Sequence, residues 1–258
     1  MYNNIFSNIP IDKRGEKPRE SGVTVILDRG LGLQAEKDFL DLAADYVDLA
    51  KNVLGTAALI DSQTMRAKID LYQQHNVQAF PGGQFLEYVI AKDKVREYFS
   101  DVIKAGFAWV EVSDNRIDIS SDKKCSLIKM ASQEYGLKVL GETGSKKVSS
   151  DLRKLIKDVK DCLDCGAWKV MFEAAELFEN GRFRNEVAEA ISQELDTTKI
   201  IFELPGPGIS KTTVSDIQFT RVWLTENLGP EVNIANVPPD DVLCLELERI
   251  NLGSNMKV

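Results

Sequence analysis

Short apolar runs recur along the chain, and each one leads through a polar loop into a stretch with helical spacing. Eight of these runs are predicted to be buried strands, because they are short, rich in β-branched residues and lack a helical period. They cover Val23–Leu27, Tyr46–Leu49, Val77–Phe80, Phe107–Val112, Leu137–Leu140, Trp168–Phe172, Lys199–Phe202 and Glu231–Ala235.

The spacing of apolar residues predicts a helix after each strand. These helices are expected near Ala35–Ala44, Asp61–His75, Phe85–Ala105 (with a break near Lys92–Asp93), Asp122–Tyr135, Ser150–Cys165, Arg182–Leu195, Lys211–Glu226 and from Pro238 onward. Strands that alternate with helices predict an α/β fold. Eight such units predict a single-domain (β/α)8 TIM barrel over residues 22–258, after an extended N-terminal segment over residues 1–21. An open doubly wound sheet is the alternative, but no G-x-G-x-x-G follows the first strand, which disfavours a dinucleotide site.

The composition of the 258 residues is that of an ordinary folded protein, with 43% hydrophobic and 28% charged residues. The net charge of −8 argues against nucleic-acid binding, which needs a basic surface. No apolar run reaches the roughly 20 residues that span a bilayer, and the polar N-terminus lacks a signal-peptide core. We therefore expect a cytoplasmic protein without a membrane partner.

Four cysteines and a single histidine limit the available side-chain chemistry. Cys162 and Cys165 form a C-x-x-C within a predicted helix, and neither a second pair nor a nearby histidine completes a zinc site. Both are expected to be thiols in the core or on the surface of that helix, with a redox role as the alternative. Because His75 is the only histidine, a Ser-His-Asp triad is excluded.

Carboxylates stand at the ends of six predicted strands. They are Asp28, Asp48, Glu111, Glu142, Glu173 and Glu203. In a barrel the carboxyl ends of the strands meet at one mouth, where function resides. A ring of acids in that mouth repels itself unless a cation neutralises it, and Mg²⁺ suits carboxylate and substrate oxygens. The alternative is that each acid belongs to a polar, exposed loop.

Basic residues and glycines are predicted at the same face. Lys51, Lys146 and Arg29 follow the second, fifth and first strands. They are expected to bind phosphate or carboxylate groups or to transfer protons, since burial and neighbours can lower the pKa of a lysine; the alternative is that they pair with the acids. Gly206, Gly208 and the start of the last helix offer backbone N–H groups to an anion.

Motifs in matching order and spacing resemble the phosphosulfolactate synthase family over nearly the whole chain. They are K-P-R-x-x-G-x-T from Lys17, D-x-G-L from Asp28, P-G-G-x-x-x-E from Pro81, G-F-x-x-V-E-V-S-D from Gly106, E-x-G-x-K from Glu142, F-E-x-P from Phe202 and L-E-x-x-R from Leu245. The run from Gly106 to Asp114 is the most specific of these motifs.

The resemblance implies a TIM-barrel lyase that adds sulfite to phosphoenolpyruvate with Mg²⁺ as cofactor, giving (2R)-phospho-3-sulfolactate. Such a reaction is a step towards coenzyme M or towards sulfolactate. In this interpretation sulfite attacks C3, negative charge builds on the substrate carboxylate as in enolase chemistry, and an acid protonates C2. A barrel enzyme of this kind is also expected to form a homo-oligomer.

The motif positions also imply roles for individual residues. The expected metal ligands are Glu142 and Glu173, with Asp28 and Glu203 as further choices. The expected catalytic residues are Lys146 for proton delivery at C2, Lys51 for the substrate carboxylate or phosphate, and Glu111, which is also a possible metal ligand. The expected substrate-binding residues are Arg29, Ser113, Gly206 and Asn233.

Several positions depart from the family pattern and mark a divergent member. Arg29 stands where lysine is usual, and Ala175 replaces an arginine after the sixth strand. Because arginine is the best bidentate phosphate ligand, its loss leaves two alternatives open. One is a divergent lyase or synthase that acts on another phosphorylated carboxylic acid, and the other is a non-catalytic, stress-associated relative. Arg182 or Arg184 is a possible replacement for the lost arginine.

Overall fold

A parallel sheet of eight strands forms the centre of the molecule, in the order β3-β2-β1-β10-β9-β6-β5-β4. The computed structural model describes residues 6, 8–145, 150–179, 181–206, 212–254 and 256. The strands are β1 (Thr24–Asp28), β2 (Leu49–Asn52), β3 (Gln78–Pro81), β4 (Trp109–Val112), β5 (Lys138–Thr143), β6 (Lys169–Phe172), β9 (Ile200–Glu203) and β10 (Asn233–Val237). The two end strands, β3 and β4, lie against each other and bring the sheet to a nearly closed barrel. The predicted (β/α)8 TIM barrel is confirmed.

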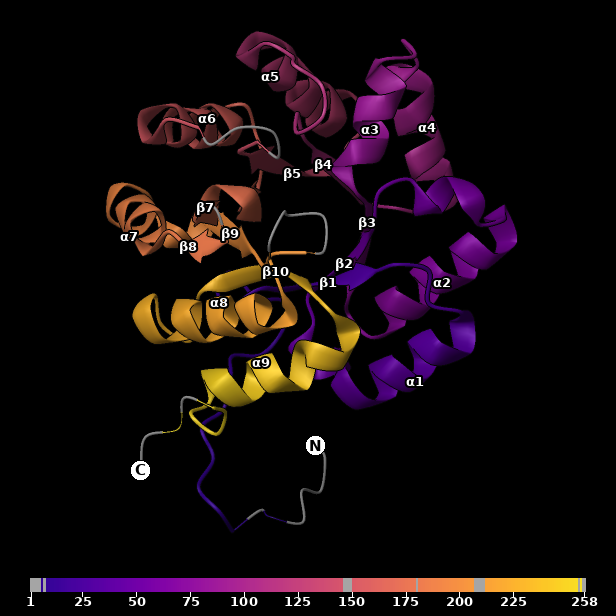
Figure 1. Cartoon of the computed structure of the whole chain (residues 1–258). Coiled ribbons are helices and arrows are strands. Elements are labelled where there is room, and N and C mark those ends of the chain that lie inside the picture. The colour runs from indigo at the N-terminus through magenta and orange to yellow at the C-terminus, as the bar shows by residue number, and fades with distance from the viewer. Residues whose placement is uncertain are drawn as a thin grey trace.

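Helices surround the strands on the outside of the barrel (Figure 1). They are α1 (Leu33–Ala43), α2 (Ser62–Gln74), α3 (Gly83–Ile90), α4 (Val95–Ala105), α5 (Ser121–Lys129), α6 (Leu152–Asp164), α7 (Asn185–Glu194), α8 (Val214–Asn227) and α9 (Val242–Arg249). The break expected near Lys92–Asp93 separates α3 from α4, and Asp93 has a positive φ of 55°. A short hairpin, β7 (Phe178–Glu179) with β8 (Arg182–Phe183), occupies the loop after β6 and was not predicted. Among the described helices, none has the length and apolar character needed to cross a membrane.

Side chains along the barrel strands alternate between the interior and the helices. The interior cluster consists of Val23, Val25, Leu49, Phe80, Trp109, Leu140, Met171, Ile201 and Ala235. Their strand neighbours, such as Ile26, Val110 and Val170, pack with helix residues in the larger outer cluster. A residue two positions after an interior residue therefore faces the interior as well, one layer closer to the mouth.

The second strand lies further along the chain than predicted. The apolar run starting at Tyr46 predicts this strand, but residues 44–46 form a 3-10 turn and β2 begins at Leu49. Asp48 therefore lies at the amino end of the barrel, where its Oδ2 accepts the Thr24 N–H at 2.9 Å. Lys51 falls inside β2 and shares the interior face with Leu49, so its side chain reaches the mouth from within the barrel.

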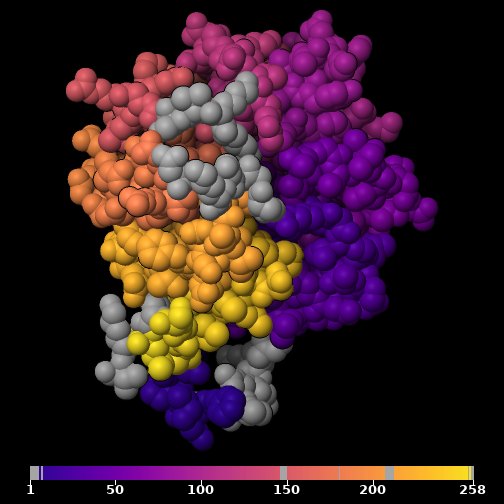
Figure 2. Space-filling model, viewed as in Figure 1, coloured from indigo at the N-terminus to yellow at the C-terminus, as the bar shows by residue number. Residues whose placement is uncertain are grey.

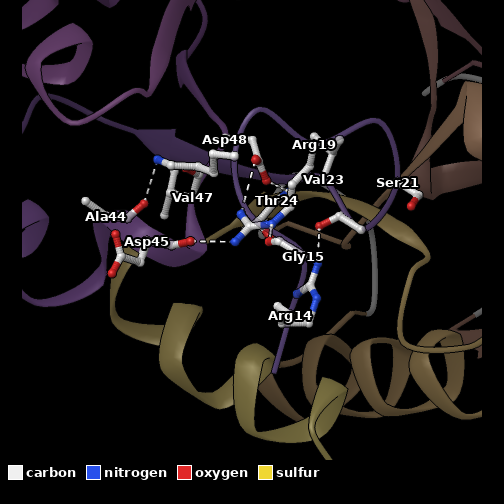
Figure 3. Close-up of polar contacts among 12 residues, drawn as sticks. Arg14, Gly15, Arg19, Ser21, Val23, Thr24, Ala44, Asp45, Val47 and Asp48 are labelled. Carbon is white, nitrogen blue, oxygen red and sulfur yellow. Dashed lines mark hydrogen bonds and ion pairs between the residues drawn. The ribbon is translucent and has the colours of Figure 1, made fainter. Parts of the chain in front are cut away.

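The N-terminal segment covers the amino end of the barrel. Lys17 Nζ donates to the carbonyls of Ala44, Val47 and His75 at 2.8 Å each. Arg19 donates to the Asp45 carbonyl at 2.6 Å and to Asp48 Oδ1 at 3.2 Å (Figure 3). Basic side chains thus satisfy carbonyl groups that precede the strands. The boundary between this segment and the barrel at residues 21/22 stays a prediction.

The first and last parts of the chain meet at this end. Arg14 pairs with Glu246 of α9 at 2.8 Å and with Glu231 at 3.2 Å. In the space-filling view the indigo N-terminal segment lies directly below the yellow C-terminal residues (Figure 2). The segment is therefore tied to the last helix as well as to the loops that precede the first strands.

One disulfide joins two neighbouring helices. Cys125 of α5 is bonded to Cys165, the residue that follows α6, with their Cα atoms 5.4 Å apart. The expectation that Cys165 is a thiol is therefore wrong, because the two helices bring residues 40 positions apart within bonding distance. Cys162, the other member of the C-x-x-C, remains a buried thiol.

Candidate active site

A cavity of about 270 Å³ opens at the carboxyl ends of the strands. All eight barrel strands contribute to its lining, either by their last residues or by the loops that follow them. The lining residues are Leu27, Arg29, Lys51, Val53, Leu54, Gly82, Gly83, Gln84, Glu111, Arg116, Glu142, Glu173, Leu204, Gly206 and Asn236. The structure thus brings together six residues named from the sequence: Arg29, Lys51, Glu111, Glu142, Glu173 and Gly206.

Lys51 is the centre of a buried charged layer at the floor of this cavity. Its Nζ donates to Glu111 Oε1 at 2.7 Å and to Glu203 Oε1 at 3.1 Å. Glu142 belongs to the same layer: one oxygen from each of Glu111, Glu142 and Glu203 lies within 4.8 Å of the others. Each of these residues is two positions after an interior apolar residue, which explains why four separate strands deliver charges to one level.

Burial and charge act against each other within this layer. Burial raises the pKa of Glu111 to about 7, and Glu142 and Glu203 add to the shift while Lys51 opposes it. Burial alone would lower the pKa of Lys51, but Glu111, Glu203 and Glu142 hold it well above its usual value. Lys51 therefore stays protonated, which suits it to stabilise negative charge and not to accept a proton.

Glu142 lies near the end of β5, Glu173 directly follows the adjacent strand β6, and both line the cavity. Glu142 Oε1 is buried and has no hydrogen-bond partner among the described residues. Glu173 accepts the Ala175 N–H at 3.2 Å and the Asn115 amide at 3.1 Å. The unpartnered Oε1 of Glu142, beside the carboxylate of Glu173, provides oxygen ligands of the kind that Mg²⁺ prefers.

Two arginines stand at the rim of the cavity, one predicted and one missed. Arg29 follows β1, and Arg116 lies in the loop after β4; both are exposed. Within the described part of the chain, neither guanidinium forms an ion pair or a hydrogen bond. The signal for Arg116 in the sequence was its place two residues after the S-D of the most specific motif.

Two predicted site residues face away from the cavity. Asp28 follows the interior residue Leu27 by one position, so its side chain points outward to α2, where it accepts from Lys68 at 2.9 Å and Tyr72 at 3.2 Å. The prediction that Asp28 is a metal ligand does not fit this orientation. Asn233 starts β10 instead of ending it, and its amide donates to the carbonyls of Ile200 at 2.8 Å and Thr198 at 3.2 Å. Its predicted contact with substrate is therefore corrected to a structural role at the amino end.

Two further predictions concern loops beside the cavity. Ser113 is fully buried and donates to Glu87 Oε1 at 2.5 Å, so it anchors the loop after β4 and is not among the lining residues. Lys146 and Gly208 lie outside the described residues. The two ends of the Lys146 loop are held by Glu176, which accepts the N–H groups of Ser145 and Ser150 at 2.8 Å each.

Replacing Asp28 with Asn is expected to affect stability more than metal binding. Asp28 is fully buried and shares Lys68 with Glu36, so the change removes one of two carboxylates around a buried ammonium group. We expect the free energy of unfolding in urea to fall by about 2–3 kcal/mol. A variant with normal stability but no thermal response to Mg²⁺ would return Asp28 to the list of metal ligands.

Comparisons with known proteins agree with this arrangement. Residues 12–255 match the family described as (2R)-phospho-3-sulfolactate synthase (ComA). The chain is 34% identical to a phosphosulfolactate synthase of Methanothermobacter thermautotrophicus, over 93% of this chain and 92% of that protein. It is 29% identical to a phosphosulfolactate synthase of Bacillus subtilis, over 98% of both chains.

The fold has solved counterparts at low sequence identity. One is 3-hexulose-6-phosphate synthase from Salmonella typhimurium, with a TM-score of 0.56 and 16% identity over 89% of this chain and 99% of that chain. At this identity the likeness shows the barrel fold and nothing about the reaction. The family follows from the full-length sequence match instead: the chain belongs to the (2R)-phospho-3-sulfolactate synthase (ComA) family.

Proposed function

We propose that this cavity catalyses the Mg²⁺-dependent addition of sulfite to phosphoenolpyruvate, which gives (2R)-phospho-3-sulfolactate. The observation that carries the proposal is a protonated, buried Lys51 among three glutamates, beneath a rim whose two arginines have no partner among the described residues. Both substrates are anions, and the reaction builds further negative charge on the substrate carboxylate. A buried cation at the floor and arginines at the rim suit both demands.

The electron flow of the reaction assigns distinct tasks to these residues. The sulfite sulfur donates its electron pair to C3, the electrons of the C2–C3 double bond move toward the carboxylate, and one proton then adds at C2. Lys51 would stabilise the charge that develops on the carboxylate, because its high pKa makes it a poor proton donor. Lys146 remains the proposed donor of the proton to C2.

Mg²⁺ is the proposed cofactor, and the donor set at the cavity fits it. Glu142 and Glu173 would hold the ion, since they line the cavity and Glu142 Oε1 is buried without a partner in the described part of the chain. Glu203 is instead tied to Lys51 beneath them. When bound, the ion supplies electrostatic stabilisation of substrate oxygens.

The experiment that tests the proposal is a direct product assay. Purified protein is mixed with phosphoenolpyruvate, sulfite and Mg²⁺, and the reaction is followed by ³¹P NMR with an EDTA control. A new phosphosulfolactate resonance that needs Mg²⁺ is the expected result. Phosphoenolpyruvate that remains unchanged would contradict the proposal and favour another phosphorylated acid, or a non-catalytic relative if no such acid reacts.

The cytoplasmic location, the homo-oligomer and the step towards coenzyme M or sulfolactate stay predictions. The disulfide between Cys125 and Cys165 bears on the first of these, because such bonds are uncommon in reducing compartments. The same NMR assay on oxidised and reduced protein would show whether activity depends on this bond.

A further inference from the structure

The loop after β4 is organised by a single buried carboxylate on α3. Glu87 Oε1 accepts the Ser113 hydroxyl at 2.5 Å and the Asn115 N–H at 3.1 Å. Glu87 Oε2 accepts the N–H groups of Arg116 at 2.7 Å and Ile117 at 3.1 Å. Four donors from one loop therefore converge on one side chain that is 1% exposed. This arrangement fixes the backbone at Arg116 relative to α3.

Gln84 lies one helical turn before Glu87 on the same helix. Residues three apart on a helix are neighbours on its surface, so the hydrogen bonds to Glu87 hold the Arg116 loop on the side of α3 that carries Gln84. Both Gln84 and Arg116 line the cavity. In the described part of the chain, neither the Gln84 amide nor the Arg116 guanidinium has a hydrogen-bond partner. Two donor groups that lack a partner among the described residues thus line the cavity beside α3.

The cavity wall at Gln84 and Arg116 follows a different part of the barrel sheet from the wall that carries Arg29. β4 and β1 are three places apart around the nearly closed sheet, so Arg116 and Arg29 approach the cavity from different directions. Arg29 shares the cavity lining with Gly206, which follows the seventh barrel strand, and it lies in a neighbouring hollow with Pro238 and Pro239, which follow the eighth. Loops after these two strands often bind phosphate in TIM barrels. The phosphate group therefore suits the Arg29 wall, and the Arg116 wall is left for another group.

We propose that Arg116 and Gln84 form the subsite for the second anion, the sulfite that becomes the sulfonate group, and that Glu87 is the positioning residue of this subsite. The assignment rests on the proposed function. Sulfite and sulfonate each present three oxygens, which the forked donors of arginine and the amide N–H of glutamine can bind together. The carboxylate of the substrate would then lie between the Arg29 wall and the Arg116 wall, above Lys51 and the glutamates.

Steady-state kinetics with each substrate varied in turn tests this subsite. The Arg116→Met variant is expected to raise KM for sulfite about 10- to 100-fold, as the loss of a charge-assisted hydrogen bond does, with less than about a 3-fold change in KM for phosphoenolpyruvate. Arg116→Lys should recover part of the loss, because it keeps the charge but not the fork. Arg29→Met should show the opposite preference. Arg96→Met is the surface control, since Arg96 lies on α4 and pairs with Glu134 at 2.8 Å.

The role of Glu87 needs a readout that simple destabilisation would not change. Glu87→Gln places an amide donor against backbone N–H donors, so the loop should shift and KM for sulfite should rise while KM for phosphoenolpyruvate stays near normal. Adding Arg116→Met to Glu87→Gln should then cost little more than Arg116→Met alone. Equal loss for both substrates would reduce Glu87 to a stability role and overturn its assignment.

Calorimetric binding of sulfite and of inorganic phosphate separates this inference from the proposed function. Wild-type protein is expected to bind both anions. The Arg116→Met change should weaken the affinity for sulfite at least about 10-fold and leave the affinity for phosphate nearly unchanged. If wild-type protein forms no product but this pattern holds, the proposed reaction fails and the subsite stands. Sulfite affinity that is absent in wild type, or unchanged in Arg116→Met, overturns the subsite even if product forms.

Discussion

The Lys51→Met variant is expected to lose about 3–5 kcal/mol of unfolding free energy at neutral pH and about 10²- to 10³-fold in turnover. Lys51 Nζ is the direct partner of Glu111 and Glu203, which are 0% and 1% exposed. Without the ammonium group, buried carboxylates face one another with no counter-charge. The same change removes the cation proposed to stabilise the substrate carboxylate.

The stability loss of Lys51→Met should depend on pH in a defined direction. Glu111 has a pKa of about 7 in the folded protein against about 4.5 when unfolded, so the folded state binds more protons between these values. The stability that this proton contributes is present at low pH and is lost as pH rises through 7. Loss of the Lys51 ammonium group should raise the pKa of Glu111 in the folded protein further, so that this stability is lost over a higher pH range. The variant should therefore lose more unfolding free energy at pH 8.5 than at pH 5.5.

Urea unfolding at these two pH values measures this effect. Lys37→Met is the matched control, because Lys37 is an exposed lysine paired with Asp41 on α1, and the unfolding midpoint should not change. A defect in Lys51→Met that is equal at both pH values would show that the buried glutamates do not set its size.

The Glu142→Gln variant is expected to abolish the stabilising effect of Mg²⁺. Binding to the folded state alone raises stability by about 2.7 kcal/mol when Mg²⁺ is present at 100 times its dissociation constant. Replacing a direct ligand should weaken Mg²⁺ binding by more than about 100-fold, because replacing even a residue that hydrogen-bonds to a ligand changes metal affinity by about 10- to 100-fold. Thermal unfolding with and without Mg²⁺ measures this without any substrate, and the product assay should show a parallel loss.

A control separates this effect from the loss of any negative charge. Glu186→Gln removes an exposed carboxylate that pairs with Arg184 outside the cavity, so the Mg²⁺ response should be kept. If Glu142→Gln still responds to Mg²⁺ like wild type, the ion is not held by Glu142. Glu173, the other proposed ligand that lines the cavity, would then be the residue to replace next.

The acids of the active site could be predicted because side chains two positions apart on a strand lie on the same face, and this spacing can be read from the sequence. Glu111 follows Trp109 by two positions, and Glu142 follows Leu140 by two, so each shares the interior face of its strand. The same rule would have excluded Asp28, which is an odd number of positions after Val23 and Val25. Position at the end of a strand is thus an incomplete criterion for a site residue, because it ignores the face of the sheet on which the side chain lies.

Errors in strand boundaries explain the other misplaced residues. The apolar run Tyr46–Leu49 predicts the second strand, but its first residue, Tyr46, belongs to a 3-10 turn. The eighth strand is predicted from Glu231, but β10 begins two residues later, at Asn233. A shift of two or three residues is small for the fold, but it moves a side chain from one end of the barrel to the other.

The remaining site features depend on contacts that no local pattern encodes. Glu87 acts on residues 26–30 positions away, and Cys125 reaches a cysteine 40 positions away. Arg116 acquires its place from the first of these contacts. Such features follow from how loops pack on helices after the barrel has formed, so the sequence offers residues for them but not their pairing.

The meeting of the two chain ends has a consequence for synthesis on the ribosome. β1 pairs with β10, and Arg14 pairs with a glutamate 232 residues later. Neither contact can form until β10 and α9 have been translated, because β10 is the partner of β1 and α9 carries that glutamate. The growing polypeptide must therefore leave the exit tunnel with one edge of β1 unpaired until β10 emerges, so barrel closure waits for the synthesis of its last strand.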